Sequence, residues 1–295
     1  MKLEARTLAA LALALPLAFS ACGSGDDTEA DPPAEAETVA SPAQNTLPAG
    51  EDDATARLDT SPRHGEWVMI RSGQDSIRSW VVYPERADNA PVVVVIHEIF
   101  GLSNWIRAVA DQLAADGFIA IAPDLLTMKG VPYGADGESD ATAARTEIRT
   151  LDNADVHRWL GAVAQYGMDL PAARDTYGVV GFCWGGAASF AHAIAAPDLG
   201  AAVVYYGTSP ATESLSSIRA PVLGLYGSDD QRVNATIPDA EAAMRSMNKT
   251  FETHIFDGAG HGFLRAQSGQ EGANMAATRE AWPLTVGWFR RTLGG

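Results

Sequence analysis

The stretch VGFCWGGAASF, Val180–Phe190, places a cysteine between glycines where two sequence patterns meet. The residues that lead into it, DTYGVVGF, form a β-branched apolar run that is typical of a buried strand. The residues that follow it, GGAASFAHAIAA, are small and alanine-rich and favour a helix. A strand that turns abruptly into a helix needs glycines where the backbone approaches its neighbours closely. We therefore expect Cys183 to lie at a sharp strand-to-helix turn.

Apolar strands and helices alternate on both sides of this turn. After an opening hairpin at 66–84, strands are predicted at 91–97, 118–124, 176–182, 200–207, 220–227 and 251–256. Helices are predicted at 104–117, 152–166, 184–196, 240–247 and 275–293. Strands that alternate with helices of about 10–15 residues predict a doubly wound α/β fold, with a mostly parallel sheet and helices on both faces. We place this domain at residues 63–295.

The first 22 residues have the pattern of an export signal. Two basic residues precede an apolar stretch, Leu8–Phe19, that is shorter than the roughly 20 residues of a membrane span. The ending FSAC resembles a bacterial lipobox, which predicts that Cys22 is lipidated and anchors an exported protein in the periplasm or cell envelope. Because Phe19 stands where leucine is commonest in that motif, cleavage near Ala21 without lipidation is an alternative. A buried N-terminal helix is a second one.

Residues 23–62 are predicted to form a disordered tether. Within residues 23–60 there are ten acidic residues, one basic residue and no aromatic residue. Such a segment buries too little apolar surface to offset the conformational entropy that ordering costs. The formal net charge of the whole chain, −16, also argues against binding to nucleic acid, which needs clustered lysine and arginine.

The chain contains two cysteines, and they have different expected roles. Lipidation would consume Cys22 and leave Cys183 as an unpaired thiol in an exported protein. A Cys22–Cys183 disulfide is the alternative, although a single bridge to a disordered tether would stabilise little.

Four polar segments follow predicted strands, and the carboxyl ends of parallel strands meet at one edge of a sheet. These segments are HEIFGL at 97–102, GFCWGG at 181–186, YGSDDQRV at 226–233 and DGAGHGFLR at 257–265. We therefore expect all four to form one site.

The segment around Cys183 matches a nucleophile elbow, with cysteine in place of the usual serine. Its position at a helix N-terminus favours a thiolate. Asp229 or Asp230 follows after one strand and His261 after the next, which is the chain order of the α/β-hydrolase triad. A small buried cysteine at a tight helix–strand contact is the alternative.

Together these motifs resemble the dienelactone hydrolase family across nearly all of residues 65–293. HEIFGL is similar to the family's glutamate segment, GFCWGG to its nucleophile segment, GSDDQRV to its acid segment and AGHGFLR to its histidine segment. The resemblance implies that Cys183 is the nucleophile, Asp230 the acid and His261 the base. The family register G-x-x-D-x-x-V favours Asp230 over Asp229, which stays the alternative.

The resemblance also implies a role for Glu98, which in this family takes the thiol proton when substrate displaces it. A fixed carboxylate beside a thiol would otherwise disfavour the thiolate. A resting thiol also oxidises more slowly than a thiolate, which suits an exported protein. A solvated or helix-capping glutamate is the alternative. We expect the backbone N–H groups of Trp184 and Ile99 to stabilise the oxyanion.

Arg265 lies four residues after His261, where the resembled family has an arginine that binds the substrate carboxylate. A guanidinium fits that role through its bidentate geometry, and a plain surface arginine is the alternative. The family's second carboxylate-binding arginine has no clear match, although Arg145 and Arg149 lie in the corresponding segment. The remaining histidines have no metal-ligand spacing, so we expect no metal and no cofactor.

The sequence thus predicts an exported, lipid-anchored hydrolase that cleaves a small ester or lactone, with or without a carboxylate, through a cysteine acyl-enzyme. We expect a monomer that acts on a small molecule and contacts the membrane only through its lipid anchor. One alternative is a related carboxylesterase or thioesterase that acts on another acyl substrate. Another is a catalytically silent binding lipoprotein, which the complete Cys–Asp–His set disfavours.

Overall fold

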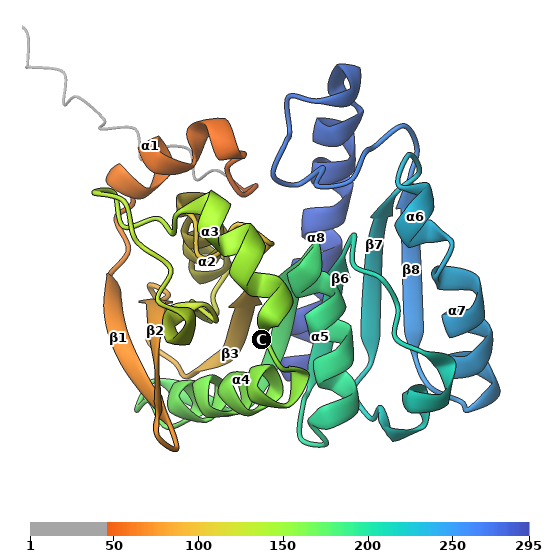
Figure 1. Ribbon diagram of the computed structural model, residues 1–295, viewed down its shortest axis with the longest axis horizontal. Helices are drawn as coiled ribbons and strands as arrows, with labels where there is room; N and C mark the ends of the chain where they lie inside the picture. The colour runs from red at the N-terminus through yellow and green to blue at the C-terminus, as the bar shows by residue number, and fades with distance from the viewer. Residues whose placement is uncertain (1–45, 295) are drawn as a thin grey trace, which may run out of the picture. The chain divides into compact units, whose positions relative to one another are not determined.

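The structure, a computed structural model, describes residues 46–294 and contains a central eight-stranded sheet (Figure 1). The sheet order is β1-β2-β4-β3-β5-β6-β7-β8. The strands are β1 (Gly65–Ser72), β2 (Asp75–Val82), β3 (Ala90–Ile96), β4 (Ile119–Pro123), β5 (Ala173–Phe182), β6 (Ala201–Tyr205), β7 (Val222–Gly227) and β8 (Phe251–Phe256). β1 pairs with β2 and β2 with β4 in antiparallel fashion, and all other pairs are parallel. The predicted mostly parallel sheet is confirmed.

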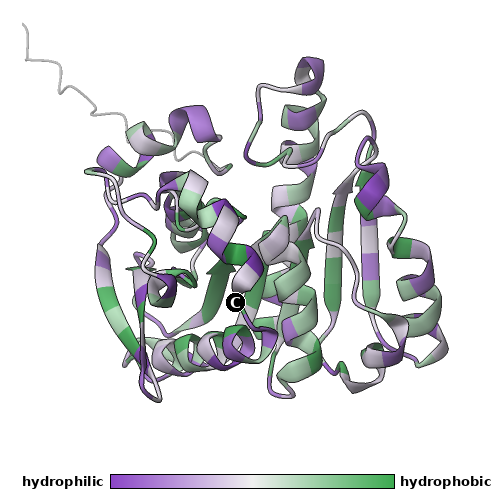
Figure 2. Cartoon of the chain, viewed as in Figure 1, coloured by the Kyte–Doolittle hydropathy of each residue, from purple (hydrophilic) through white to green (hydrophobic). Residues whose placement is uncertain are grey.

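Helices cover both faces of the sheet. They are α1 (Ala54–Asp59), α2 (Asn104–Ala115), α3 (Ala141–Glu147), α4 (Asn153–Met168), α5 (Trp184–Ala195), α6 (Gln231–Asn234), α7 (Ile237–Ser246) and α8 (Ala273–Leu293), with short 3-10 turns elsewhere. The central strands β3, β4 and β6 are apolar and fully buried, whereas the edge strands β1 and β8 and the helices mix apolar and polar residues (Figure 2). This pattern is expected where strands are buried on both faces and each helix has one buried face.

Two apolar cores form because side chains alternate along each strand. On β3, Val93 and Val95 pack in the core that contains α2 and α8. Val92 and Val94 point to the other face, where the core contains α4, α5 and α7. The sheet is therefore held between two layers of helices, and its carboxyl-end edge is left for polar residues.

Residues 46–62 differ from the predicted tether, because the structure places helix α1 against α2 within this range. Ala49 and Ala54 are buried, and the Trp105 indole Nε1–H donates to the Ala49 carbonyl at 3.1 Å. The Arg57 guanidinium donates to the Gln112 side chain at 3.2 Å. The small alanine side chains thus let the backbone of this segment pack closely against α2. The acidic composition of the segment does not reveal this packing.

The predicted signal peptide at 1–22, Cys22 and the tether up to residue 45 lie outside the described residues. Within residues 46–294, no helix has both the length and the apolar character that crossing a membrane requires. Cys183 carries a free thiol.

Candidate active site

The carboxyl ends of the parallel strands position the predicted residues along one edge of the sheet. Glu98 follows β3, Cys183 follows β5, Asp230 follows β7 and His261 follows β8. Because these strands are neighbours or near neighbours in the sheet, segments up to 163 residues apart in the chain lie together.

Cys183 lies at a strained turn between β5 and α5. Its φ of 56° and ψ of −111° lie in a region that residues with side chains rarely adopt. A Cβ on Gly181 would lie 1.9 Å from the Gly185 carbonyl oxygen, and a Cβ on Gly185 would lie 2.4 Å from the Ile96 carbonyl oxygen. Only glycine fits at both positions, and the resulting tight turn lifts the half-buried sulfur above the sheet edge.

Asp230, and not Asp229, contacts the histidine. The His261 Nδ1 and the Asp230 Oδ2 are 2.5 Å apart, and Asp230 is 7% exposed, whereas Asp229 is exposed. The carboxylate accepts the Nδ1–H and leaves Nε2 as the histidine's free nitrogen. This arrangement orients the imidazole as a base or acid.

Glu98 is buried beside Arg265. Its carboxyl is 3% exposed, and burial raises its pKa to about 7, although the nearby Arg265 guanidinium opposes that rise. The Arg265 Nε and Glu98 Oε2 are 2.8 Å apart, but the N–H is not aligned for a hydrogen bond, so the contact is an ion pair. A carboxyl with a pKa near neutrality can either hold or release a proton at physiological pH.

His97 fixes the backbone on which Glu98 sits. The Leu125 N–H donates to His97 Nε2 at 3.2 Å, which leaves Nδ1 to donate to the Glu98 carbonyl at 2.7 Å. Burial lowers the pKa of His97, so the ring is neutral. It also stacks on Trp184 with ring centroids 5.9 Å apart. His97 therefore positions the Glu98 backbone by linking it to the loop after β4.

The Cys183 sulfur is surrounded by groups that keep it protonated. Burial, and next the charge of Glu98, raises the pKa of the thiol to about 11. The Trp184 backbone N–H and the Arg232 guanidinium lower that pKa, but they offset only part of the rise. In the described part of the chain, the sulfur makes no side-chain hydrogen bond to His261. A pKa of about 11 favours the protonated thiol at neutral pH.

Two backbone N–H groups, those of Trp184 and Ile99, are the ones that the sequence predicts as oxyanion donors. Trp184 is the first residue of α5, where helix N–H groups have no partner within the helix. Ile99 follows Glu98 in the loop after β3. Among residues 46–294, neither N–H donates to a backbone carbonyl.

The sequence did not single out Tyr206, which lies at the carboxyl end of β6. Its φ is 41°, its hydroxyl is buried without a hydrogen-bond partner in the described residues, and its ring meets the His261 ring edge-on at 5.2 Å. Its position at the end of a parallel strand, followed by Gly207, was a signal that could have identified it.

A cavity of about 490 Å³ lies between the loop after β3, helices α1 and α3, and Arg265. Phe100 forms one wall, with the Arg145 guanidinium 4.7 Å and the Arg265 guanidinium 5.1 Å from its ring centroid. The structure thus brings Arg145 to the same cavity as Arg265. Arg149 lies on the 3-10 turn that follows α3 and does not line the cavity.

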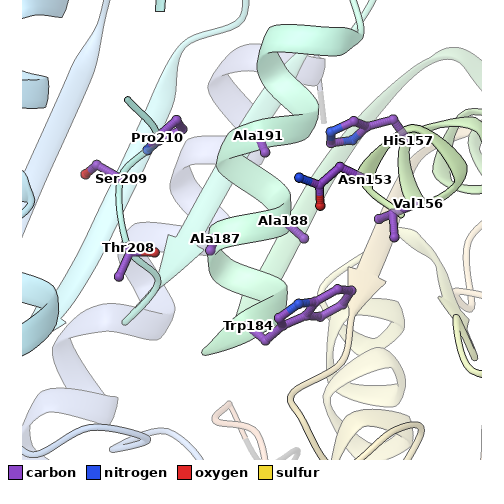
Figure 3. Close-up of a pocket in the computed structure, with 10 residues that line it drawn as sticks. All are labelled: Asn153, Val156, His157, Trp184, Ala187, Ala188, Ala191, Thr208, Ser209 and Pro210. Carbon is purple, nitrogen blue, oxygen red and sulfur yellow. The ribbon is translucent and has the colours of Figure 1, made fainter. Parts of the chain in front are cut away.

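A second cavity, of about 250 Å³, lies along α5 (Figure 3). Trp184 lies at one end, and His157 of α4 and Ser209 from the loop after β6 line it on opposite sides of α5. His192 is buried nearby, and its Nε2 is 3.2 Å from the Tyr177 hydroxyl. Within residues 46–294 no group of three or more histidine, cysteine or carboxylate side chains could hold a metal ion.

Comparison with known proteins gives consistent matches. Residues 77–293 match the model of the dienelactone hydrolase family. A protein of Escherichia coli strain K12 named "Putative carboxymethylenebutenolidase" is 29% identical over 86% of this chain and 93% of its own length. A protein of the same name from Salmonella typhimurium is 30% identical over 75% of this chain and 85% of its own.

Solved structures agree with these matches. A crystal structure titled as a putative dienelactone hydrolase from Klebsiella pneumoniae covers 77% of this chain and 98% of its own, with a TM-score of 0.67 and 28% identity. A dienelactone hydrolase structure from Anabaena variabilis has a TM-score of 0.59 at 21% identity, with 78% of this chain and 98% of its own covered. The fold is therefore an α/β-hydrolase fold.

Proposed function

The chain belongs to the dienelactone hydrolase family, and from this premise we propose that it hydrolyses a small ester or lactone through an acyl-enzyme on Cys183. The observation that carries the proposal is the grouping of a free thiol, a bonded Asp230–His261 pair and a buried Glu98 at one edge of the sheet. These groups provide a nucleophile, an oriented base and a second proton acceptor.

The resting enzyme holds the sulfur as a thiol. A pKa of about 11 for the thiol and about 7 for Glu98 makes proton transfer from sulfur to carboxylate unfavourable before substrate binds. Substrate that enters the site moves Glu98 out of its ion pair and toward the sulfur. The carboxylate then takes the proton, and the thiolate forms next to the carbonyl carbon.

The thiolate attacks the carbonyl carbon, and a carbon–sulfur bond forms as the carbonyl π electrons move to oxygen. The N–H groups of Trp184 and Ile99 stabilise this oxyanion. The carbonyl then re-forms and the carbon–oxygen single bond of the ester or lactone breaks. The proton that Glu98 took from the thiol passes to the free Nε2 of His261, which delivers it to the leaving alkoxide. A water molecule, deprotonated by His261, attacks the thioester and releases the acid and the Cys183 thiol. All of these steps use side chains and backbone groups of this chain and one water molecule, without a cofactor.

We propose that the cavity lined by Arg265 and Arg145, which adjoins Glu98 through Arg265, receives the acyl group of the substrate. Both guanidinium groups border Phe100, so the acyl group would lie against an aromatic face with charged side chains at its rim. We also propose that the protein is exported and lipid-anchored through Cys22, on the signal-like pattern of residues 1–22.

Turnover of a chromogenic short-chain ester, compared between wild type and Cys183→Ala, tests the proposal. We expect the substitution to abolish turnover with little loss of stability, because it removes one half-buried sulfur. Cys183→Ser should also be poor, since a hydroxyl ionises far less readily than a thiol. Residual activity within about tenfold of wild type would contradict the acyl-enzyme, because loss of a nucleophile costs orders of magnitude. Absence of turnover in wild type across esters and lactones would favour a silent binding lipoprotein.

A further inference from the structure

We propose that Glu51 is a specificity-determining residue that occupies the anion position at Arg265 and selects against acyl groups ending in a carboxylate. The inference rests on the proposed hydrolysis and narrows its substrate to esters or lactones with an uncharged acyl group. Glu51 precedes the family match at 77–293 and lies in the segment that the sequence pattern assigned to the tether.

Glu51 contacts Arg265 with both its side chain and its backbone. The Arg265 Nη1 donates to the Glu51 Oε2 in an ion pair. The Glu51 backbone N–H donates to the Arg265 carbonyl at 2.9 Å. Two contacts between the same two residues fix the carboxylate in the position where an incoming anion would meet the guanidinium.

The segment that carries Glu51 packs on the domain and forms part of the cavity wall. The residues that precede it are held by the domain: Gln267 Nε2 donates to the Pro48 carbonyl at 3.0 Å, and Trp105 Nε1 donates to the Ala49 carbonyl at 3.1 Å. Ala54, three residues after Glu51, is 1% exposed and packs in the core beneath α1. The backbone that carries Glu51 is therefore held in place by buried neighbours, and its carboxylate, 44% exposed, is held by Arg265.

The charges of the cavity leave little room for another anion. Arg265 already faces Glu98 through Nε, at 2.8 Å, and Glu51 through Nη1. Asp52 and Glu138 also line the cavity, and Arg145 is the second cation there. A substrate carboxylate would have to displace Glu51 or lie beside it, and like charges at close range oppose binding. An uncharged acyl group meets no such cost.

Two esters that differ only at the far end of the acyl group test the proposal. p-Nitrophenyl valerate ends in a methyl group, and the p-nitrophenyl monoester of glutarate has a carboxylate in its place. We expect wild type to have the higher kcat/KM for valerate. Glu51→Gln should shift the ratio toward the glutarate ester by about fivefold or more, mainly through KM, because one partly exposed charge is removed near the binding site.

Matched variants separate charge from structure. Glu51→Asp keeps the charge and should keep the wild-type preference, whereas Glu51→Ala, a second charge-removing variant, should shift it as Glu51→Gln does. Asp59→Asn makes the same charge change at an exposed position at the end of α1 and should leave the ratio unchanged. Thermal unfolding of each variant identifies any variant in which the segment that carries Glu51 no longer packs on the domain.

Binding of glutarate itself, measured by calorimetry, gives a reading that does not depend on turnover. Glutarate should bind about fivefold more tightly to Glu51→Gln than to wild type, as expected for removal of one like charge. If both esters are hydrolysed but neither the kcat/KM ratio nor glutarate affinity changes in folded Glu51→Gln, Glu51 is only a structural clamp and the inference is overturned. If no ester is hydrolysed and glutarate still binds the variant more tightly, the inference stands and the proposed reaction fails.

Discussion

Two buried carboxylates border the Cys183 region, and they are held in different ways. Asp230, 7% exposed, shares a 2.5 Å hydrogen bond with His261. Glu98, 3% exposed, faces the Arg265 Nε at 2.8 Å without hydrogen-bond alignment, and burial raises its pKa to about 7. The difference teaches that burial alone does not assign a role to a carboxylate. The hydrogen bond to His261 suits Asp230 to orient the imidazole. Glu98 has no aligned hydrogen bond to Arg265, which leaves its carboxylate able to take up a proton.

The largest effect is expected where orientation is lost. Asp230→Asn should lower kcat/KM by roughly a thousandfold or more, because an amide cannot hold the His261 ring in the same tautomer and charge state. Steady-state turnover of a chromogenic ester measures this loss. Asp229→Asn is the matched control, since Asp229 is exposed, and it should cost far less. If the two variants reverse this order, Asp229 is the acid that orients His261, and the role given to Asp230 is wrong.

A smaller effect is expected where proton transfer is lost. Glu98→Gln cannot accept the thiol proton, so single-turnover acylation should slow by about a hundredfold, the scale of a lost general base. Substrate binding should change much less, since glutamine keeps the shape of the side chain. His261 can then replace only part of the lost function. A Glu98→Gln enzyme with wild-type acylation would mean that Glu98 serves only as a partner of Arg265.

The strand-end residues were predictable because each lies within a few residues of the end of a predicted strand. Cys183, Asp230 and His261 were found in this way, and the glycines around Cys183 indicated the turn before any contact was known. The choice between Asp229 and Asp230 rested on register in the resembled family. In the structure Asp230 is buried and Asp229 is exposed, because the two side chains point in different directions from the turn after β7.

Other parts of the site depend on contacts between distant segments. Glu51 reaches Arg265, 214 residues later in the chain, and Arg145 reaches the same cavity from α3. Neither contact leaves a local pattern in the sequence. The acidic composition of residues 23–60 even favoured disorder where buried Ala49 and Ala54 anchor the chain. Small buried residues carry little sequence signal, although they allow a close backbone approach.

The protonation state of Cys183 at rest is the central claim, and the pH dependence of its alkylation by iodoacetamide tests it most directly. In wild type the rate should rise with a midpoint near pH 11, because burial and the Glu98 charge raise the thiol pKa to about 11. At pH 7 the rate should therefore be about a hundredfold or more below that of free cysteine, whose pKa is about 8.5. Glu98→Gln removes a negative charge, so the midpoint should fall and alkylation at pH 7 should accelerate even as turnover slows. Glu280→Gln, exposed on α8, should alkylate as wild type does. Rapid alkylation at mildly acidic pH, with no change in Glu98→Gln, would mean a preformed thiolate–imidazolium pair and would contradict the account.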